Sequence, residues 1–555
     1  MIKENFIKIY EEGFKKNWDL PALSNYTSRE TINFGEFAAE IARLHLLFKQ
    51  CKIKKGDKIS LVGKNNINWC TVYMATITYG AVIVPILQDF HPNDIRHILN
   101  HSDSVLLFCS DNIWEHIDED SIENIKAVFS INDKSLFYEK KGERVGEIYE
   151  KLEQNFASTY PHGFSREDIK YANQGNDEVV LLNYTSGTTG FSKGVMLTGN
   201  NLAGNVTYAI TLDVLRRGEK ALSFLPLAHA YGCAFNFILP MAVGTHVTLL
   251  DKVPSPKVLM KAFADVRPHI VITVPLIIEK IYRKMIIPII TKPAMKLALS
   301  IPLLNDRIYA TIRKKLIDAM GGRFCEVIIG GAAFNQEVEE FFHRIKFPFT
   351  VGYGMTECGP LISYDHHHEF IPTSCGQVLK GIMKVRIASD DPYNKVGEIQ
   401  VKGENVMKGY YKNNEATKAV FTKDGWLKTG DLGTIDRDNH IFIRGRDKTM
   451  ILSGNGQNIY PEEIEAKMNN LPYVNESLII EKNGKLVALV YPDFDAMDAD
   501  GLSAEEDLTQ IMEANKLKLN KIVAPYETVS GIQLFPNEFE KTPKKSIKRY
   551  LYQNY

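Results

Sequence analysis

Short, almost wholly apolar runs separated by helical patterns are the feature that most limits how this chain can fold. They lie between about residues 57 and 360. Strands that are apolar on both faces belong to sheets covered by helices on both sides. The pattern therefore predicts an α/β fold, and a length of 555 residues predicts several subdomains rather than one core. The clearest runs are residues 58–62, 81–85, 246–250, 269–274 and 326–329.

The pattern changes twice towards the C-terminus. Between about residues 375 and 445 the runs become shorter and more polar, which predicts a small β subdomain. Beyond Arg446, Pro461 begins a helix-like segment with acidic residues in its first turn. Asn483-Gly484 then joins two apolar runs, which is a strong hairpin signal. These segments predict a separate small α+β domain.

We therefore expect two domains. The N-terminal domain would cover residues 1–447 and hold two doubly wound α/β subdomains together with the small β subdomain. The C-terminal α+β domain would cover residues 448–555. No internal repeat or low-complexity tract interrupts either part.

Composition argues against two classes of protein. The formal net charge of −1 gives no broad basic footprint, so nucleic acid is not expected as a partner. The seven cysteines are odd in number and contain no Cys-x-x-Cys pair, so a disulfide framework or a zinc site is not expected either. Free thiols fit a reducing compartment such as the cytoplasm. The cysteines are Cys51, Cys70, Cys109, Cys233, Cys325, Cys358 and Cys375.

Two apolar segments raise the question of membrane contact. Charges interrupt the N-terminal segment, so no secretory signal is expected there. Its apolar residues, from Ile2 to Trp18, recur at helical spacing; a helix docked on its own domain is favoured over one lying on a membrane. Residues 285–304 are apolar but broken by prolines and lysines, so they are not expected to cross a bilayer. Three explanations of this apolar segment stay open: contact with an apolar substrate, a surface that faces a membrane, or an ordinary core.

A hydroxyl- and glycine-rich loop follows the apolar run at residues 179–182. Glycines let the backbone approach a ligand, aligned N–H groups form an anion nest, and a lysine adds positive charge, so the loop suits a polyphosphate. The register of a kinase or GTPase loop fails, because Lys193 is followed by glycine instead of Ser or Thr. A flexible linker is disfavoured, because a helix-like segment follows from Asn201. The candidate phosphate ligands are Thr185, Ser186, Gly187, Thr188, Thr189, Gly190 and Lys193.

Four further residues have ligand chemistry, although each has an ordinary alternative. Glu357 ends the sequence Gly-Tyr-Gly-Met-Thr-Glu and suits Mg²⁺, but it could be a solvated glutamate. Asp431 after a Thr-Gly turn could accept hydrogen bonds from a ribose diol, or simply close the turn. Arg446 could bind the same ribose or a phosphate, or lie on the surface. His229 stands alone among apolar residues, where a core histidine is more common.

The joint order of these motifs resembles that of the adenylate-forming enzymes, which include acyl-CoA synthetases, luciferases and the adenylation domains of peptide synthetases. The resemblance covers roughly residues 20–550. The sequences Gly-Met-Thr-Glu-Cys-Gly-Pro-Leu-Ile at 354–362 and Asn-Gly-Gln-Asn-Ile-Tyr-Pro-Glu-Glu-Ile-Glu at 455–465 look most like the long-chain fatty acyl-CoA synthetases. Such enzymes first join a carboxylate to the α-phosphate of ATP and release pyrophosphate. The CoA thiol then attacks the acyl-adenylate, and AMP leaves.

The resemblance implies a role for each matching residue. The loop from Thr185 to Lys193 would grip the β- and γ-phosphates, and Thr185 and Glu357 would coordinate Mg²⁺. Thr356 would bond the α-phosphate, and His229 would lie beside the acyl carboxylate. The residues expected around adenine, the acyl pocket and the ribose are Gly331, Ala332, Tyr353, Gly354, Asp431 and Arg446.

The resemblance also implies that the C-terminal domain rotates between the two half-reactions. Lys448 matches the hinge, and Gly456 matches the glycine that faces the CoA tunnel. The usual C-terminal lysine, which bridges the carboxylate and the α-phosphate, is replaced here by Ser546. Lys545 is the nearest substitute and Lys544 the next, because a lysine stem is long and mobile. Slow adenylation, or loss of the first half-reaction, is the alternative.

The expected function is ATP-dependent activation of a medium- or long-chain fatty acid, followed by thioester formation with CoA. Loading of a carrier protein, or use of another carboxylic acid, is the alternative within enzymes. A non-catalytic nucleotide-binding relative is the alternative outside them, and the intact Thr185, Glu357 and Asp431 argue against it. Neither the acyl chain length nor the oligomeric state follows from the sequence.

Overall fold

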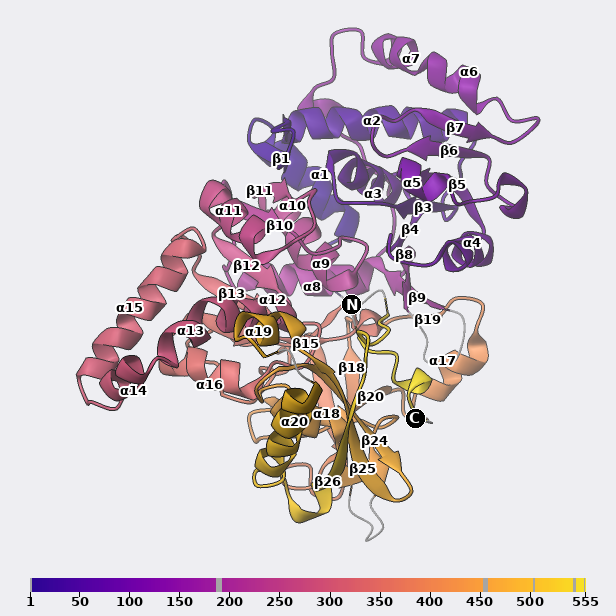
Figure 1. Ribbon diagram of the computed structural model, residues 1–555. Coiled ribbons are helices and arrows are strands. Elements are labelled where there is room, and N and C mark those ends of the chain that lie inside the picture. Colours follow the sequence, from indigo (N-terminus) through magenta and orange to yellow (C-terminus); the bar gives the residue numbers. More distant parts are fainter. Residues whose placement is uncertain (1, 186–191, 453–457, 503–504, 543–545, 554) are drawn as a thin grey trace.

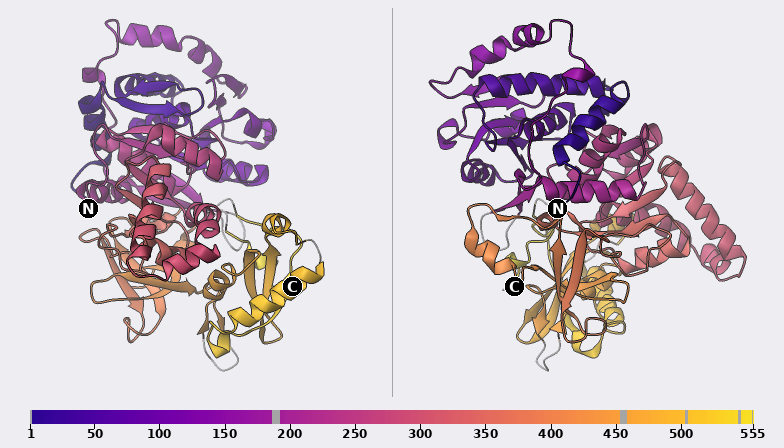
Figure 2. Two further views of the ribbon diagram at one scale, coloured as in Figure 1. Left: turned by 60° about the vertical axis from the view of Figure 1, so that its left-hand side comes forward. Right: turned by 180° about the vertical axis from the view of Figure 1, so that it is seen from behind.

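The computed structural model describes residues 2–185, 192–452, 458–502, 505–542, 546–553 and 555. In Figure 1 an α/β part lies above and a smaller β part below, with the C-terminal segment beside the β part. Figure 2 gives the same arrangement from two other sides. The predicted α/β fold is confirmed.

The first large sheet carries the candidate phosphate loop. Its central strands are parallel, and antiparallel strands close both edges. In spatial order the strands are β19 (Gly409–Tyr410), β9 (Lys193–Thr198), β8 (Val179–Thr185), β4 (Val82–Ile86), β3 (Lys58–Val62), β5 (Ser104–Cys109), β6 (Ala127–Ser130) and β7 (Leu136–Glu139). The buried pattern of β3 and β4 agrees with their apolar sequences.

A second large sheet is also parallel except at one edge, where β2 pairs antiparallel with β1. Its strand order is β14 (Phe349–Val351), β13 (Glu326–Ile329), β12 (Ile270–Thr273), β10 (Lys220–Ser223), β11 (His246–Leu249), β1 (Pro21–Asn25) and β2 (Thr31–Asn33). The N-terminal strands thus join a sheet formed mostly by residues beyond 220.

The small β subdomain and the C-terminal segment have sheets of their own. The subdomain sheet is antiparallel, with order β17 (Met383–Ala388), β18 (Gly397–Gly403), β20 (Leu427–Ile435) and β21 (Ile441–Arg446). The C-terminal sheet has order β24 (Val474–Lys482), β25 (Lys485–Pro492) and β26 (Val529–Leu534). Short pairs are β15 (Tyr353–Gly354) with β16 (Leu361–Ser363), and β22 (Ile451–Leu452) with β23 (Asn458–Ile459).

Helices lie between the strands along the chain. Those that precede β8 are α1 (Phe6–Asn17), α2 (Phe34–Gln50), α3 (Ile67–Tyr79), α4 (Pro92–His101), α5 (Asp111–Trp114), α6 (Val145–Glu150) and α7 (Leu152–Thr159). Those that follow β9 are α8 (Gly199–Thr211), α9 (Ala230–Cys233), the π-helix η3 (Ala234–Ile238), α10 (Leu239–Val243), α11 (Pro256–Val266), α12 (Pro275–Ile281), the π-helix η4 (Tyr282–Ile286), α13 (Ile287–Ile290), α14 (Pro293–Leu299), α15 (Leu304–Ala319), α16 (Gln336–Arg344) and α17 (Asn414–Val420).

The C-terminal segment holds α18 (Pro461–Met468), α19 (Phe494–Ala499) and α20 (Glu505–Leu519). Short 3-10 turns are η1 (Glu119–Ser121), η2 (Arg166–Asp168), η5 (Thr356–Cys358), η6 (Pro525–Glu527) and η7 (Arg549–Leu551). Two local predictions are confirmed here: Pro461 begins α18, and Asn483-Gly484, both with positive φ, form the turn between β24 and β25.

The hydrophobic core changes at the predicted domain boundary. One cluster of buried side chains runs from Phe6 to Ile441, with Ile443 packed against it. A second begins at Ile459, with Ile451 at its edge, and contains only C-terminal residues. This separation supports the expected division, although the limits 1–447 and 448–555 stay a prediction.

The N-terminal helix α1 turns its apolar face into the protein. Phe6, Ile7, Tyr10 and Phe14 are buried, and Asn5 caps the helix by accepting a hydrogen bond from the Lys8 N–H. A helix docked on its own domain is therefore the correct interpretation of this segment. None of the described helices combines the length with the hydropathy that a bilayer-spanning segment needs.

Candidate active site

The candidate phosphate loop lies at the tip of the β8–β9 hairpin. Thr185 and Lys193 stand opposite each other in its antiparallel register. The helix expected from Asn201 is α8, but β9 lies between it and the loop. The strand register therefore places the backbone of a hydroxyl-bearing residue opposite that of an ammonium-bearing residue. The predicted ligands Ser186, Gly187, Thr188, Thr189 and Gly190 lie outside the described residues.

Tyr410 connects this hairpin to the candidate magnesium ligand. Strand β19 pairs with β9, so that Tyr410 lies opposite Val195. The Tyr410 hydroxyl donates to Glu357 Oε1 at 2.9 Å, and Lys193 Nζ lies 5.2 Å from the centre of the Tyr410 ring. Burial, and then Glu357, raise the pKa of the Tyr410 phenol, so it remains a donor. The sequence prediction did not include Tyr410, because a Gly-Tyr-Tyr run has no chemistry of its own.

The chemistry of the donor set fits Mg²⁺. The Thr185 hydroxyl and the Glu357 carboxylate supply oxygen, which hard cations prefer. The bond from Tyr410 fixes Oε1 of Glu357, while no donor among the described residues bonds Oε2. One carboxylate oxygen therefore stays open to a cation. The backbone at Glu357 is anchored as well, because its carbonyl accepts from the Met407 N–H at 2.8 Å.

A second polar corner forms where β20 and β21 meet the strand β15. Asp431 and Arg446 are cross-strand partners, and Arg446 Nε lies 3.0 Å from Asp431 Oδ1. The Tyr353 hydroxyl donates to the other carboxylate oxygen at 2.6 Å. Asp431 is buried, whereas the Arg446 side chain is 70% exposed. The corner thus offers a fixed carboxylate and a guanidinium that is free to reach a ligand.

The segment after β13 passes very close to an aromatic ring. A Cβ at Gly330 would lie 3.1 Å from the Tyr231 ring, and Gly331 has φ +87°, so side chains are disfavoured at both positions. The Tyr231 hydroxyl donates to the Ile328 carbonyl at 3.1 Å. This contact holds the segment that contains Gly331 and Ala332 beside the helix that follows His229.

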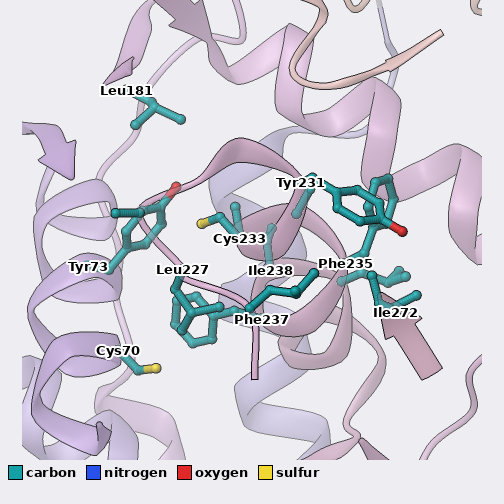
Figure 3. Packing of buried hydrophobic residues seen from close by; sticks show 14 of the residues in the cluster. Cys70, Tyr73, Leu181, Leu227, Tyr231, Cys233, Phe235, Phe237, Ile238 and Ile272 are labelled. Atoms are coloured by element: carbon teal, nitrogen blue, oxygen red, sulfur yellow. The ribbon is translucent and has the colours of Figure 1, made fainter. Parts of the chain in front are cut away.

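His229 caps the short helix α9. Its Nδ1 accepts a hydrogen bond from the Tyr231 N–H at 3.3 Å. Figure 3 shows two residues of the helical segment that follows His229 in the chain. Tyr231 and Phe235 lie on the side of Ile272 and away from Tyr73. The aromatic rings of Tyr231 and Phe235 are 5.8 Å apart. The histidine is thus positioned at the end of a buried, tightly packed helix.

These groups surround one cavity of about 3150 Å³. The predicted site residues in its lining are Thr185, Lys193, His229, Gly331, Ala332, Tyr353, Gly354, Thr356, Glu357, Asp431, Arg446 and Lys448. Its apolar lining includes Leu212, Leu215, Phe235, Leu239, Ile272 and Val274. The fold thus brings all described members of the predicted site to one space. Their individual roles stay predictions.

Residues 10–411 match the family model described as AMP-binding enzyme. The chain belongs to this family. Its expected use of ATP with Mg²⁺ and of CoA is confirmed through this membership.

Curated relatives of this AMP-binding enzyme include the long-chain-fatty-acid–CoA ligase FadD15 of Mycobacterium bovis. It is 26% identical, over 93% of this chain and 90% of that protein. The peroxisomal long chain acyl-CoA synthetase 7 of Arabidopsis thaliana is 28% identical, over 93% of this chain and 79% of that protein. The sequence therefore aligns with those of fatty-acid ligases over almost its full length.

Solved structures show the same fold. ATP-bound MatB from Rhodopseudomonas palustris has a TM-score of 0.76 at 20% identity and covers 99% of both chains. The anthranilate CoA ligase AuaEII, in complex with anthranoyl-AMP, has a TM-score of 0.78 at 18% identity and covers 99% of this chain and 97% of that one. At such identities the likeness concerns the fold alone.

The C-terminal segment of this AMP-binding enzyme supplies another wall of the cavity. The Thr542 N–H donates to the Ser546 carbonyl at 2.8 Å, and Lys541 pairs with Ile547 in a short bridge. Thr542, Ser546 and Ile547 line the cavity. Lys544, Lys545 and the predicted CoA-side Gly456 lie outside the described residues. The ends of the segment that contains Lys545 nevertheless lie at the site.

Proposed function

We propose that this enzyme activates a medium- or long-chain fatty acid with ATP and then transfers the acyl group to CoA. The observation that carries the proposal is that one cavity is lined both by polar or charged groups and by large apolar side chains. The polar lining combines oxygen donors, an ammonium and a guanidinium around Thr185, Glu357 and Arg446. The apolar lining includes Phe235 and Leu239, which follow His229 closely in the sequence. Such a cavity suits a molecule with one charged end and a long hydrocarbon tail.

The first step would join two anions, so positive charge is its main requirement. The fatty carboxylate attacks the α-phosphate of ATP, the bond to the β-phosphate breaks, and pyrophosphate leaves. Lys193, which begins β9 opposite Thr185, would face the leaving phosphates. Thr356 and Lys545 would balance charge at the α-phosphate. Preorganised groups of this kind commonly supply the largest share of rate enhancement.

Thr185 and Glu357 would hold Mg²⁺, which supplies charge neutralisation for the triphosphate. Tyr410 keeps Glu357 in place through its hydroxyl. Asp431 would accept hydrogen bonds from the ribose diol, with Tyr353 fixing the carboxylate. The nucleotide would thus be oriented before the acid reacts.

In the second step the CoA thiol attacks the acyl carbon, and AMP leaves with the electron pair of the broken mixed-anhydride bond. We assign the change between the steps to rotation about Lys448. In support, the hydrophobic core of the large part ends near Ile443 and that of the C-terminal segment begins near Ile451. A few residues between two cores can absorb a backbone rotation.

A coupled assay of AMP release tests the proposal. The acids are acetate, octanoate, dodecanoate, palmitate and benzoate, each with and without CoA. We expect CoA-dependent AMP release that is highest with one of the longer saturated acids. AMP release with benzoate or acetate, but with none of the longer acids, would exclude the fatty-acid assignment. If AMP is released only after a phosphopantetheinylated carrier protein is added, the carrier protein and not CoA is the acyl acceptor. If no acid leads to AMP release, the enzymatic function is excluded.

A further inference from the structure

A helical arm lies in the connection between β12 and β13, two inner strands of the second large sheet. It comprises residues 282–319, from η4 through α13 and α14 to α15, and we call it the basic arm. Figure 1 shows α14 and α15 at the outer side of the molecule, and the right-hand view of Figure 2 shows the same segment projecting. Neither α13 nor α14 buries a side chain, and Leu316 is the buried residue of α15. Tyr282, Ile286 and Leu316 anchor the arm to the core, whereas residues 291–315 bury no side chain.

The basic arm carries a strong local charge. It contains eight basic and two acidic residues, whereas the whole chain has a formal net charge of −1. Its basic residues form no ion pair with any carboxylate of the described chain. The exposed members are Lys284, Lys292, Lys296, Arg307, Lys314 and Lys315. Unpaired charge of one sign at this density produces a local field that attracts an anionic surface.

The same arm exposes large aliphatic side chains. Leu297 is 69% exposed and Leu303, in the turn between α14 and α15, is 80% exposed. Ile301 lies in the same turn and is also exposed. Met285, Ile289 and Leu304, elsewhere in the arm, are exposed as well. Several large exposed apolar side chains in one segment indicate a site of interaction.

We propose that the basic arm docks this protein onto a lipid bilayer that contains anionic headgroups. Binding at a bilayer surface increases with the apolar area that enters the acyl boundary and with attraction between basic residues and anionic lipid. The arm offers both within the same two helices. Nucleic acid would satisfy the lysines but offers no hydrocarbon in which Leu297 and Leu303 can be buried.

The position of the arm links it to the cavity. Helix α12 runs directly into η4, and Leu276 and Lys280 of α12 line the cavity wall. Leu276 is also exposed to solvent. A docked arm would therefore hold this side of the cavity close to the bilayer, where a fatty acid partitions. This last link rests on the proposed function, whereas docking itself does not.

Vesicle flotation of the full-length protein tests the docking without nucleotide or acid. The vesicles contain phosphatidylglycerol with phosphatidylcholine, or phosphatidylcholine alone. We expect binding to the anionic vesicles that weakens at high salt. The triple variant K292E/K296E/K314E should weaken it by roughly tenfold or more. The double variant L297S/L303S should weaken it by roughly severalfold, because apolar area is lost.

Matched controls keep the test specific. The triple variant K384E/K482E/K485E makes the same change of charge at exposed lysines outside the arm, and L517S removes a leucine that is 61% exposed in α20. Both should bind anionic vesicles as the unaltered protein does. AMP release with octanoate in the absence of vesicles should be unchanged in the arm variants, which shows that they fold.

Three results would overturn the docking proposal: no binding to anionic vesicles, equal losses in arm and control variants, or binding to duplex DNA or RNA but not to vesicles. A failure of the proposed function is distinct, because it shows as absent AMP release in an enzyme that still floats with vesicles.

Discussion

The two sides of the cavity are built in different ways. On the large-domain side, strand register and hydrogen bonds fix the groups directly: Thr185 lies opposite Lys193, and Asp431 lies opposite Arg446. On the C-terminal side, the segment around Ser546 is held by contacts within its own domain. Lys541 pairs there with Glu476 and Glu538, and Phe539 and Tyr552 form a small separate core.

The difference suggests a division of labour. Groups that hold the nucleotide would keep one geometry throughout the reaction, because moving them would break sheet hydrogen bonds. A group needed in one half-reaction alone is better placed on a part that can move as a unit. Variants on the large-domain side should therefore impair nucleotide binding and adenylation together, whereas variants near Lys545 should impair adenylation alone.

The largest effect is expected from Glu357→Gln. An amide is a much weaker Mg²⁺ ligand than a carboxylate, so acid-dependent ATP–pyrophosphate exchange should fall by roughly a hundredfold or more. The Mg²⁺ concentration for half-maximal exchange should rise as well. Glu398→Gln is the control, since Glu398 lines the same cavity without an assigned role. Equal behaviour of the two variants would remove Glu357 from the metal site.

Lys545→Ala should slow adenylate formation by about tenfold to a hundredfold, because a positive charge at the α-phosphate is lost. Thioester formation from a supplied acyl-adenylate should change little. Lys544→Ala and Ser546→Ala serve as neighbouring controls in the same pyrophosphate-exchange assay. Small and equal effects of all three substitutions would contradict the assignment of Lys545.

Tyr410→Phe should reduce exchange by roughly severalfold to tenfold, because Glu357 loses a charge-assisted hydrogen bond. Tyr411→Phe is closely matched: its hydroxyl also donates to a carboxylate, that of Asp103, at 2.9 Å. Tyr411→Phe should leave exchange unchanged. A deficit of the same size in both variants would point to a general loss of stability rather than to positioning of Glu357.

The smallest effect on activity, with a clear effect on stability, is expected from Glu339→Gln. Burial raises the pKa of Glu339 from its ordinary value of 4.5 to about 7. Between these values the folded protein binds more protons than the unfolded chain, so its free energy of unfolding falls as pH rises. The amide of Glu339→Gln does not titrate. In this variant the decrease in the free energy of unfolding with rising pH should therefore be smaller by up to about 3 kcal/mol.

Urea unfolding at pH 5 and pH 8 measures this effect. Exposed Glu415→Gln, in α17, is the control and should keep the pH dependence of the unaltered protein. An unchanged difference between the two pH values in Glu339→Gln would show that the carboxyl of Glu339 does not titrate differently in the folded protein.

Local signals in the sequence predicted much of this structure. Apolar runs marked β3 and β4, and turn chemistry marked Asn483-Gly484, because these depend on neighbouring residues. The sequence did not predict which distant segments pair with each other. Tyr410 acts through β19, which joins β9 from far along the chain, and nothing in its local sequence indicates that partner.

The apolar segment 285–304 illustrates the same limit. Its composition is compatible with a core, and only the three-dimensional arrangement exposes Leu297 and Leu303 on a projecting arm. The order of the site motifs, by contrast, led us to expect Thr185, Glu357 and Asp431 in one site, and all three line the same cavity. The contacts that hold those side chains in place came from the structure alone.

The most direct test of the central claim is ATP–pyrophosphate exchange by the unaltered protein, with Mg²⁺, with and without dodecanoate, and without CoA. If the two sides of the cavity together form an adenylating site despite Ser546, exchange will depend on the fatty acid and will not require CoA. Absence of acid-dependent exchange across the whole acid panel, in protein that still binds ATP, would contradict it.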